Sequence, residues 1–303
     1  MHNNIIAVIP TYNRGNMLKQ CIDSLLNQSY PLEKIVIIDD DSTDNTNDII
    51  NSYGSIVDTI HGDGNWWWAT CMNAGIEYGL SKGADYILAM NDDTFLETNA
   101  IEYLLESSQK YKGAIIGGIV MDKEKSGKMI NKGYGAKYSK YRWHPYKKVV
   151  GAVSGRDIYY TEGQSGRGVL FPASVYKKVG LYDIENFPHR GDRDFSYRCL
   201  QMGIGQYLDS GATVYLNFDS SYQGVANKRF TFKDVKSALF HINGLYNIDH
   251  QYKFLRKHYK YLWPLWLIGW LLPVVGKCII RMTPFRGNIF NRFFKRRAYG
   301  PNS

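Results

Sequence analysis

The chain has 303 residues, 44% of them hydrophobic, which is enough for one large α/β domain with an appendage or for two smaller domains. Its net charge of +9 is concentrated at one end, because eleven of the 37 Lys and Arg residues and none of the 28 acidic residues lie from Gln251 onward. The near-neutral remainder argues against a nucleic-acid partner, and four scattered cysteines without a CxxC pair exclude a disulfide-rich secreted scaffold.

The N-terminus reaches an apolar, β-like run within four residues and has no basic segment before a cleavable apolar one. We therefore expect no secretory signal and a cytoplasmic protein with reduced thiols.

The first half alternates short β-branched runs with amphipathic stretches, the pattern of βαβ units around a mostly parallel sheet. The predicted strands cover residues 5–9, 35–38, 56–60, 86–90 and 114–120. The predicted helices cover residues 16–27, 44–52, 69–80 and 97–109. The predicted fold class is therefore α/β, with helices on both faces of the sheet.

The region from residue 122 to 168 is rich in Gly, Lys, Tyr and Ser and has weak periodicity, so we expect hairpins and long loops there. Regular patterning resumes at 168–171, with a helix predicted over 192–202 and a strand over 213–216. Because no repeat or low-complexity linker interrupts them, residues 1–225 are predicted to form one domain, followed by a helical region over 226–303.

Polar segments follow each of the first four predicted strands, where an open parallel sheet binds its ligands. These segments are Pro10-Thr11-Tyr12-Asn13-Arg14, Asp39-Asp40-Asp41-Ser42, His61-Gly62-Asp63-Gly64 and Asn91-Asp92-Asp93-Thr94. Six carboxylates at one sheet edge would repel each other unless a cation or hydrogen-bond donors lie among them.

Asn91-Asp92-Asp93 suits Mg²⁺ or Mn²⁺, which takes one or two carboxylates plus substrate phosphates. The alternative is a helix cap, because Asp-Asp-Thr is also good capping chemistry. The polar segments at the other strand ends favour the metal site over the helix cap.

Two further segments have open interpretations. Asp39-Asp40-Asp41 is either a turn into the next helix or an acceptor for the N3–H of a pyrimidine base. Asp192 opens a predicted helix, where it is either a partner of the helix dipole or a general base.

Taken in order, the segments resemble the family 2 inverting glycosyltransferases of the GT-A fold, over residues 5 to about 220. The resemblance rests on "AVIPTYNR", "IVIIDDDSTDNT", "NAGIEYG" preceded by Asn65, "YILAMNDDT" and "GVLFPASVYKKVGLYDIENFPHRGDRDFSYRCLQMG". In addition, "HINGLYNIDHQYKFLRKHY" resembles the closing segment of the rhamnosyltransferase-like branch, which acts on lipid-linked cell-surface glycans.

The resemblance implies a role for each matching position. Asp192 is the expected catalytic base, with Asp194 in the same motif, and Asp93 is the expected metal ligand, holding Mg²⁺ or Mn²⁺. The residues expected to bind the nucleotide sugar are Pro10, Thr11, Asn13, Arg14, Asp40, Asn65, Trp67, Asn73 and Asp92. Those expected to bind the acceptor are Trp66, Trp68, His189 and Arg198. The sequence departs from the family at two places, because Gly191 stands where relatives usually have Glu, and Leu216-Asn217 where many have a His that can touch the metal.

Three consecutive tryptophans, Trp66 to Trp68, cannot all point into one core, because a helix or a strand turns successive side chains apart. We expect one or two of them to line the binding site of the donor or acceptor sugar, since aromatic faces stack on pyranose rings. The alternative is that all three pack in the core.

The tail contains an apolar stretch, "YLWPLWLIGWLLPVVG" from Tyr261 to Gly276, with two prolines. Sixteen residues fall short of the roughly 20 that span a bilayer. With three tryptophans and flanking Lys and Arg, the stretch predicts a segment lying in the membrane interface. The alternatives are a helix docked on the domain or in a homodimer interface.

The sequence thus predicts a metal-dependent inverting glycosyltransferase, peripheral on the inner face of a bacterial cell membrane. The expected donor is a UDP- or dTDP-sugar, and the expected acceptor is a lipid-linked saccharide or an oligosaccharide in cell-surface glycan synthesis. The alternatives are a nucleotidyltransferase acting on a sugar phosphate and a non-catalytic membrane-bound assembly subunit.

Overall fold

The computed structural model of the chain describes residues 3–122, 129–131, 149–216, 229–242 and 244–283. The chain divides into two compact units, residues 1–218 and 219–303, each described here by itself. The predicted domain boundary at residue 225 lies outside the described residues.

The first unit is built on an 11-stranded sheet whose N-terminal half is parallel. Strands β3 (Val57–His61), β2 (Lys34–Asp39), β1 (Ile5–Thr11) and β4 (Tyr86–Ala89) lie side by side in that order and all run parallel. This part confirms the predicted βαβ pattern.

The C-terminal half of the sheet is mixed. Strand β10 (Val169–Pro172) runs antiparallel between β4 and β6 (Ile115–Asp122), and β11 (Gln206–Leu216) runs parallel to β6. Three further strands pair antiparallel with their neighbours, β5 (Thr94–Leu96) and β9 (Arg156–Tyr160) with β11, and β7 (Met129–Asn131) with β6. Strand β8 (Val149–Val153) forms with β9 a hairpin of the kind predicted for this region.

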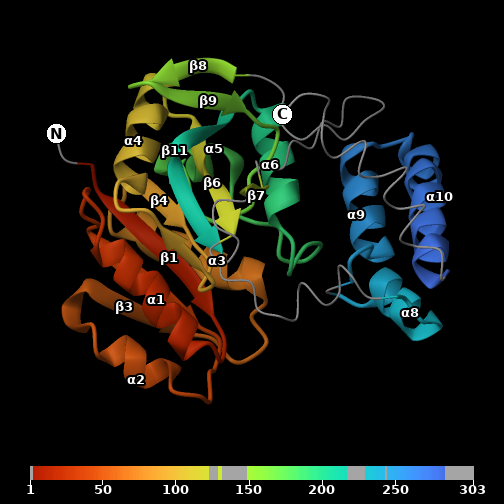
Figure 1. The fold of residues 1–303 in the computed structure, drawn as a ribbon, viewed down its shortest axis with the longest axis horizontal. Helices are drawn as coiled ribbons and strands as arrows, with labels where there is room; N and C mark the ends of the chain where they lie inside the picture. Colours follow the sequence, from red (N-terminus) through yellow and green to blue (C-terminus); the bar gives the residue numbers. More distant parts are fainter. Residues whose placement is uncertain (1–2, 123–128, 132–148, 217–228, 243, 284–303) are drawn as a thin grey trace. The chain divides into compact units, whose positions relative to one another are not determined.

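Helices cover both faces of the sheet, because successive strand residues point to opposite sides (Figure 1). Ile5 and Ala7 pack with α1 (Gly15–Leu26), α2 (Thr46–Asn51) and α4 (Ala100–Lys110). Ile6 and Val8 pack with α3 (Trp68–Ser81), α5 (Ala173–Val179) and α6 (Asp192–Gln201). The α/β fold class expected from the sequence is confirmed.

The register of the parallel strands brings their polar segments to one edge. Thr11 pairs with Asp39 across β1 and β2, and Asp39 pairs with His61 across β2 and β3. These strands therefore end at the same level, and the segments that follow them meet there.

The described residues of the second unit form the helices α8 (Phe232–Phe240), α9 (Ile248–His258) and α10 (Trp263–Met282). Thr231 opens α8 with a capping box, since its side chain accepts from the backbone N–H of Asp234 while the Asp234 carboxylate accepts from that of Thr231.

Helix α10 is longer than predicted. Pro264 lies in its first turn, where no backbone N–H is needed, and Pro273 is accommodated inside it, so the helix continues past Gly276 for a total of 20 residues. The expectation that this segment is too short to span a bilayer is wrong. By length and composition alone, α10 is long and apolar enough to cross a membrane.

Candidate active site

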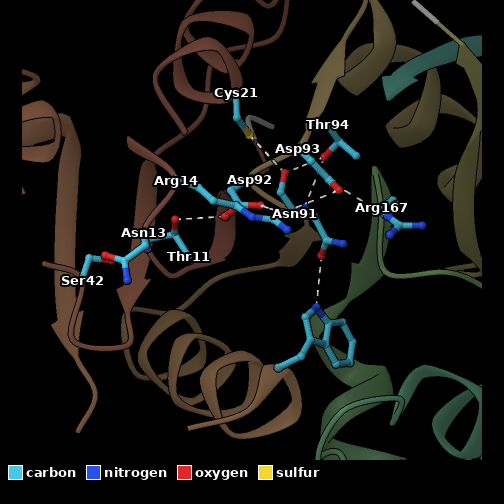
Figure 2. A network of polar contacts seen from close by, with 11 residues as sticks. Thr11, Asn13, Arg14, Cys21, Ser42, Asn91, Asp92, Asp93, Thr94 and Arg167 are labelled. Atoms are coloured by element: carbon cyan, nitrogen blue, oxygen red, sulfur yellow. Dashed lines mark hydrogen bonds and ion pairs between the residues drawn. The ribbon is translucent and has the colours of Figure 1, made fainter. Parts of the chain in front are cut away.

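The acidic motif lies between β4 and β5, and its first carboxylate is tied to the end of β1. Asp92 is 5% exposed and accepts hydrogen bonds from Thr11 Oγ1 at 3.0 Å and Arg14 Nη1 at 3.1 Å (Figure 2). Burial raises the pKa of Asp92 to about 6, with Arg14 opposing the rise and the charge of Asp93 adding to it. Negative charge is therefore crowded at this point of the sheet edge.

The second carboxylate is the better candidate for a metal ligand. Asp93 Oδ1 is buried and has no hydrogen-bond partner among the described residues. Arg14 Nη1 lies 3.9 Å from Asp93 Oδ2, too far for a hydrogen bond. A buried carboxylate oxygen without a hydrogen-bond partner is chemically suited to bind a cation.

The donor set limits what kind of cation fits. No group of three or more His, Cys, Asp or Glu gathers anywhere in the described part of the chain. The residues present suit an ion that draws its other ligands from substrate phosphates and water, as Mg²⁺ and Mn²⁺ do.

The loops after β1, β2 and β3 are tied to one another. Asp40 is buried, its backbone N–H donates to Thr11 O at 3.1 Å, and its Oδ1 accepts from Gly64 N at 2.9 Å. Asn13, in a left-handed conformation, donates from its backbone N–H to Ser42 Oγ at 2.8 Å. These hydrogen bonds hold Asp40 at the sheet edge, where the family resemblance predicts that it binds the nucleotide of the donor.

Three other predicted donor-site positions differ in their surroundings. Pro10 is half-buried at the end of β1, and Asn65 lies on the exposed loop before α3, where its N–H donates to Asp63 Oδ1 at 3.0 Å. Asn73 instead exchanges two 2.9 Å hydrogen bonds with the backbone of Tyr182, one in each direction. The amide of Asn73 thus fastens α3 to the chain after α5, and the structure gives it a positioning role instead of a contact with the donor.

The three tryptophans have different surroundings. Trp66 is half-buried and packs against the core between the sheet and α3. Trp68 is half-buried too, donates from Nε1 to Asn91 Oδ1 at 3.1 Å and stands edge-on to Tyr182. Trp67 is 43% exposed, with its ring centroid 5.8 Å from that of His189. Of the three, Trp67 is the one open to a ligand, together with the half-buried His189.

Asp192 is the first residue of α6 and is half-buried. Its Oδ1 accepts a hydrogen bond from the backbone N–H of Arg193 at 2.9 Å. Burial raises the pKa of Asp192 above the ordinary aspartate value, opposed by this N–H and by the charges of Arg167 and Arg190. A carboxylate with a raised pKa holds a proton more readily, as a general base must.

Asp194 and Arg198 lie in a different environment from Asp192. Asp194 is 0% exposed and accepts from Arg198 Nε at 2.9 Å. Arg198 also donates to the carbonyl oxygens of Val179 at 2.8 Å and Leu181 at 2.7 Å. This pair of a buried carboxylate and a half-buried guanidinium fastens α6 to the end of α5, so the geometry argues against the expected catalytic role of Asp194 and the expected acceptor contact of Arg198.

Sequence reasoning missed one charged residue of this site, Arg167. Its Nε lies 3.9 Å from Asp93 Oδ1, across from Arg14 in the ion-pair network of Figure 2. The available signal was its position between two glycines, Gly166 and Gly168, directly before a buried strand.

Comparison with known proteins finds a matching family and several relatives. The model of a family described as Glycosyl transferase family 2 matches residues 6–160. Over 121 residues the chain is 31% identical to glycosyltransferase GlyG of Streptococcus pneumoniae serotype 4, covering 39% of this chain and 39% of that protein. It is 26% identical to dTDP-rhamnosyl transferase RfbF of Shigella flexneri over 216 residues, covering 67% of this chain and 66% of that protein. The matches thus span less than two thirds of these relatives.

Solved structures share the fold. The crystal structure of S. aureus TarS 1-349 in complex with UDP matches with a TM-score of 0.56 at 12% identity, covering 94% of this chain and 91% of that one. GalNAc-T7 with UDP, GalNAc and Mn²⁺ matches with a TM-score of 0.54 at 15% identity, covering 85% of this chain and 54% of that one. At these identities the likeness concerns the fold alone.

Proposed function

The chain belongs to glycosyl transferase family 2, and from this premise we propose that it transfers a sugar from a nucleotide-sugar donor to a saccharide acceptor. The observation that carries the proposal is the meeting of the donor-type segments at one sheet edge, around a carboxylate oxygen of Asp93 that lacks a hydrogen-bond partner. We take the donor to be a UDP- or dTDP-sugar, which is supported by the dTDP-rhamnosyl relative and by the UDP in two structural neighbours.

In the proposed reaction, Asp192 takes the proton from an acceptor hydroxyl. The hydroxyl oxygen forms a bond to the anomeric carbon while the bond from that carbon to the diphosphate breaks, so the nucleoside diphosphate leaves with the electron pair and the configuration inverts. The raised pKa of Asp192 supports its role as base. Trp67 and His189 offer an open aromatic wall for a sugar ring.

We assign Asp93, with Asp92 beside it, to a site for Mg²⁺ or Mn²⁺. Such an ion, when bound, supplies positive charge to the leaving diphosphate. The Thr11 and Arg14 contacts fix the Asp92 carboxylate, so the motif is oriented in advance.

The metal assignment is tested by metal binding and by activity. Mn²⁺ binding, followed by electron paramagnetic resonance of the full chain, should be lost in Asp93→Ala while the fold persists, and EDTA should stop transfer. Full transfer in EDTA would contradict metal dependence.

We propose that the acceptor is lipid-linked and that the protein works as a peripheral protein on the inner face of the cell membrane. The support is helix α10, whose exposed apolar residues recur at helical spacing, namely Leu265, Ile268, Leu272, Val275 and Ile279. A stripe of this kind suits a helix that lies in the membrane interface.

The donor is identified by a thermal-shift panel of nucleotide sugars with Mn²⁺, because a ligand that binds the folded state raises its melting temperature. We expect a UDP- or dTDP-sugar to raise the melting temperature of the wild-type protein. A response to nucleoside triphosphates alone, with pyrophosphate as the product, would point to a nucleotidyltransferase.

A further inference from the structure

Arg167 lies beside the acidic motif without being hydrogen-bonded to it. Its Nε is 3.9 Å from Asp93 Oδ1, close enough for charge attraction but too far for a hydrogen bond (Figure 2). Both atoms are buried, and neither has a hydrogen-bond partner in the described part of the chain. A buried donor and a buried acceptor thus lie close together, and neither is hydrogen-bonded. Buried polar groups of this kind usually have a partner, so the two side chains are suited to bind a ligand.

The chemistry of these two groups specifies what is missing. A guanidinium N–H donates well to phosphate oxygens, and the planar fork of arginine matches the spacing of two of them. A carboxylate oxygen cannot accept from a phosphate, but it can hold the cation that accompanies one. A diphosphate with its cation would therefore satisfy Arg167 and Asp93 together.

Arg167 is flanked by two glycines in left-handed backbone conformations. Gly166 and Gly168 have φ of +62° and +63°, which a residue with a side chain rarely adopts. A Cβ at Gly168 would lie 2.4 Å from Val214 Cγ2, and one at Gly166 2.8 Å from the ring of Trp68. Glycine at both positions therefore lets the backbone on either side of Arg167 pass close to Trp68 and Val214.

We propose that Arg167 is a residue of the donor site that contacts the diphosphate and stabilises its charge as it leaves. This inference rests on the proposed function and adds to it a residue outside the expected set. The charge of Arg167 also acts on Asp192, so the guanidinium lies within electrostatic reach of both the acidic motif and the base.

The test is calorimetric binding of UDP and dTDP to the full chain with Mn²⁺, with uridine and thymidine as the same ligands without phosphates. Arg167→Gln should weaken binding of the nucleotide that the wild type prefers by about tenfold to a hundredfold, the loss expected for one charged hydrogen bond. The nucleotide affinity of Arg167→Lys should lie between those of the wild type and Arg167→Gln. Nucleoside binding should not change in either variant. Lys177→Gln, at an exposed position in the last turn of α5, removes the same charge as a control and should bind like the wild type.

Each other result overturns the inference in a recognisable way. Unchanged nucleotide binding in Arg167→Gln, with tighter Mn²⁺ binding, would make Arg167 a mere counter-ion of Asp93. Equal weakening of nucleotide and nucleoside would make it a structural residue of the loop. If Arg167→Gln does not fold, as judged by circular dichroism, Arg167→Lys decides in the same way. A wild type that binds neither nucleotide would refute the proposed function itself, and this inference with it.

Discussion

At the scale of single residues, the account depends on two carboxylates of α6 that lie two positions apart and differ in their surroundings. Asp192 is half-buried with a raised pKa, whereas Asp194 is fully buried against Arg198. Substituting each in turn separates proton transfer from packing.

Asp192→Asn should lower turnover by about two to four orders of magnitude, because the amide cannot accept the proton. Stability should stay the same or rise. Since burial raises the folded-state pKa of Asp192, this group adds stability below its unfolded pKa and loses that contribution as pH rises through the folded value. At neutral pH the charged carboxylate is therefore a cost that Asn removes. The measurements are steady-state rates and melting temperatures at pH 7.

The matched substitution is Asp194→Asn. It removes the charge of the fully buried carboxylate that accepts from Arg198 Nε, and losing a hydrogen bond between charged groups costs about 1.5 to 3 kcal/mol. We expect a lower melting temperature in this variant and not in Asp192→Asn. An inactive but fully stable Asp194→Asn beside an active Asp192→Asn would show that the base is Asp194.

The pH dependence of the wild-type rate should follow the two site carboxylates whose pKa values burial raises, Asp192 and Asp92. The value of kcat/KM should fall as pH is lowered through these pKa values, which lie above that of an ordinary aspartate. The pH-rate profile of a slow acceptor gives this midpoint, and a midpoint at or below the ordinary aspartate value would contradict the assignment.

The tryptophans offer a second separation of recognition from packing. Trp68→Ala removes a half-buried ring and its bond to Asn91, so it should cost about 3 kcal/mol of stability. Trp67→Ala should change stability by less than about 1 kcal/mol, because Trp67 is 43% exposed and more open than Trp68, and should mainly lower kcat/KM. Denaturant unfolding and steady-state kinetics of both variants test these expectations. An unstable Trp67→Ala with normal kinetics would show that Trp67 is a packing residue.

At the scale of elements, helix α3 must approach the sheet closely to carry its N-terminus to the site. A Cβ on Gly75 would lie 2.3 Å from Val8 Cγ1 and 2.6 Å from Ile38 Cδ1. Gly75→Ala should therefore destabilise the first unit by about 1 to 3 kcal/mol through overpacking. Gly269→Ala in α10, where a Cβ meets nothing within 4 Å, is the control and should be neutral or stabilising. Equal effects of the two substitutions would contradict the packing argument.

The elements that the sequence predicted well are those with strong periodicity. The four parallel strands and α1, α3 and α4 were found because their apolar residues recur with clear spacing. Strand β11 was predicted over only its last four residues, whereas it runs from Gln206 to Leu216. Its buried Asp209 is neutralised by Arg156, and the side chain of Gln206 donates to Ser196 O. Because these polar residues interrupt the apolar pattern, the first part of the strand could not be recognised in the sequence.

Other features depend on contacts that no local pattern carries. The antiparallel insertion of β10 between β4 and β6 arises from long-range pairing. The ion pair of Asp194 and Arg198 has the i,i+4 spacing of a helix pair and was open to prediction, but the family motif drew attention to its chemistry instead. Arg167 reaches Asp93 because β10 pairs antiparallel with β4, with Val169 opposite Ala89, so the residue before this pairing lies beside the motif that follows β4.

At the scale of the whole molecule, the prediction concerns the apolar face of α10. Replacing Leu265 and Leu272 together by Asp puts two charges on its exposed stripe and should abolish co-sedimentation with anionic liposomes, while donor binding persists. High salt should weaken the wild-type interaction, since each Lys or Arg near the surface contributes about 1 kcal/mol. A wild type that stays in the supernatant, or a variant that sediments equally, would favour a docked helix or a homodimer interface, which sedimentation velocity distinguishes.

The central claim is that this chain is an inverting glycosyltransferase whose base is Asp192. The most direct measurement is nuclear magnetic resonance of the reaction with the donor found in the thermal-shift panel, which reports the anomeric configuration of the product as the nucleoside diphosphate is released. The account predicts a product of opposite configuration to the donor, formed by the wild type and by Lys177→Gln but not by Asp192→Asn. A product that retains the donor configuration, or one formed at the wild-type rate by Asp192→Asn, would contradict it.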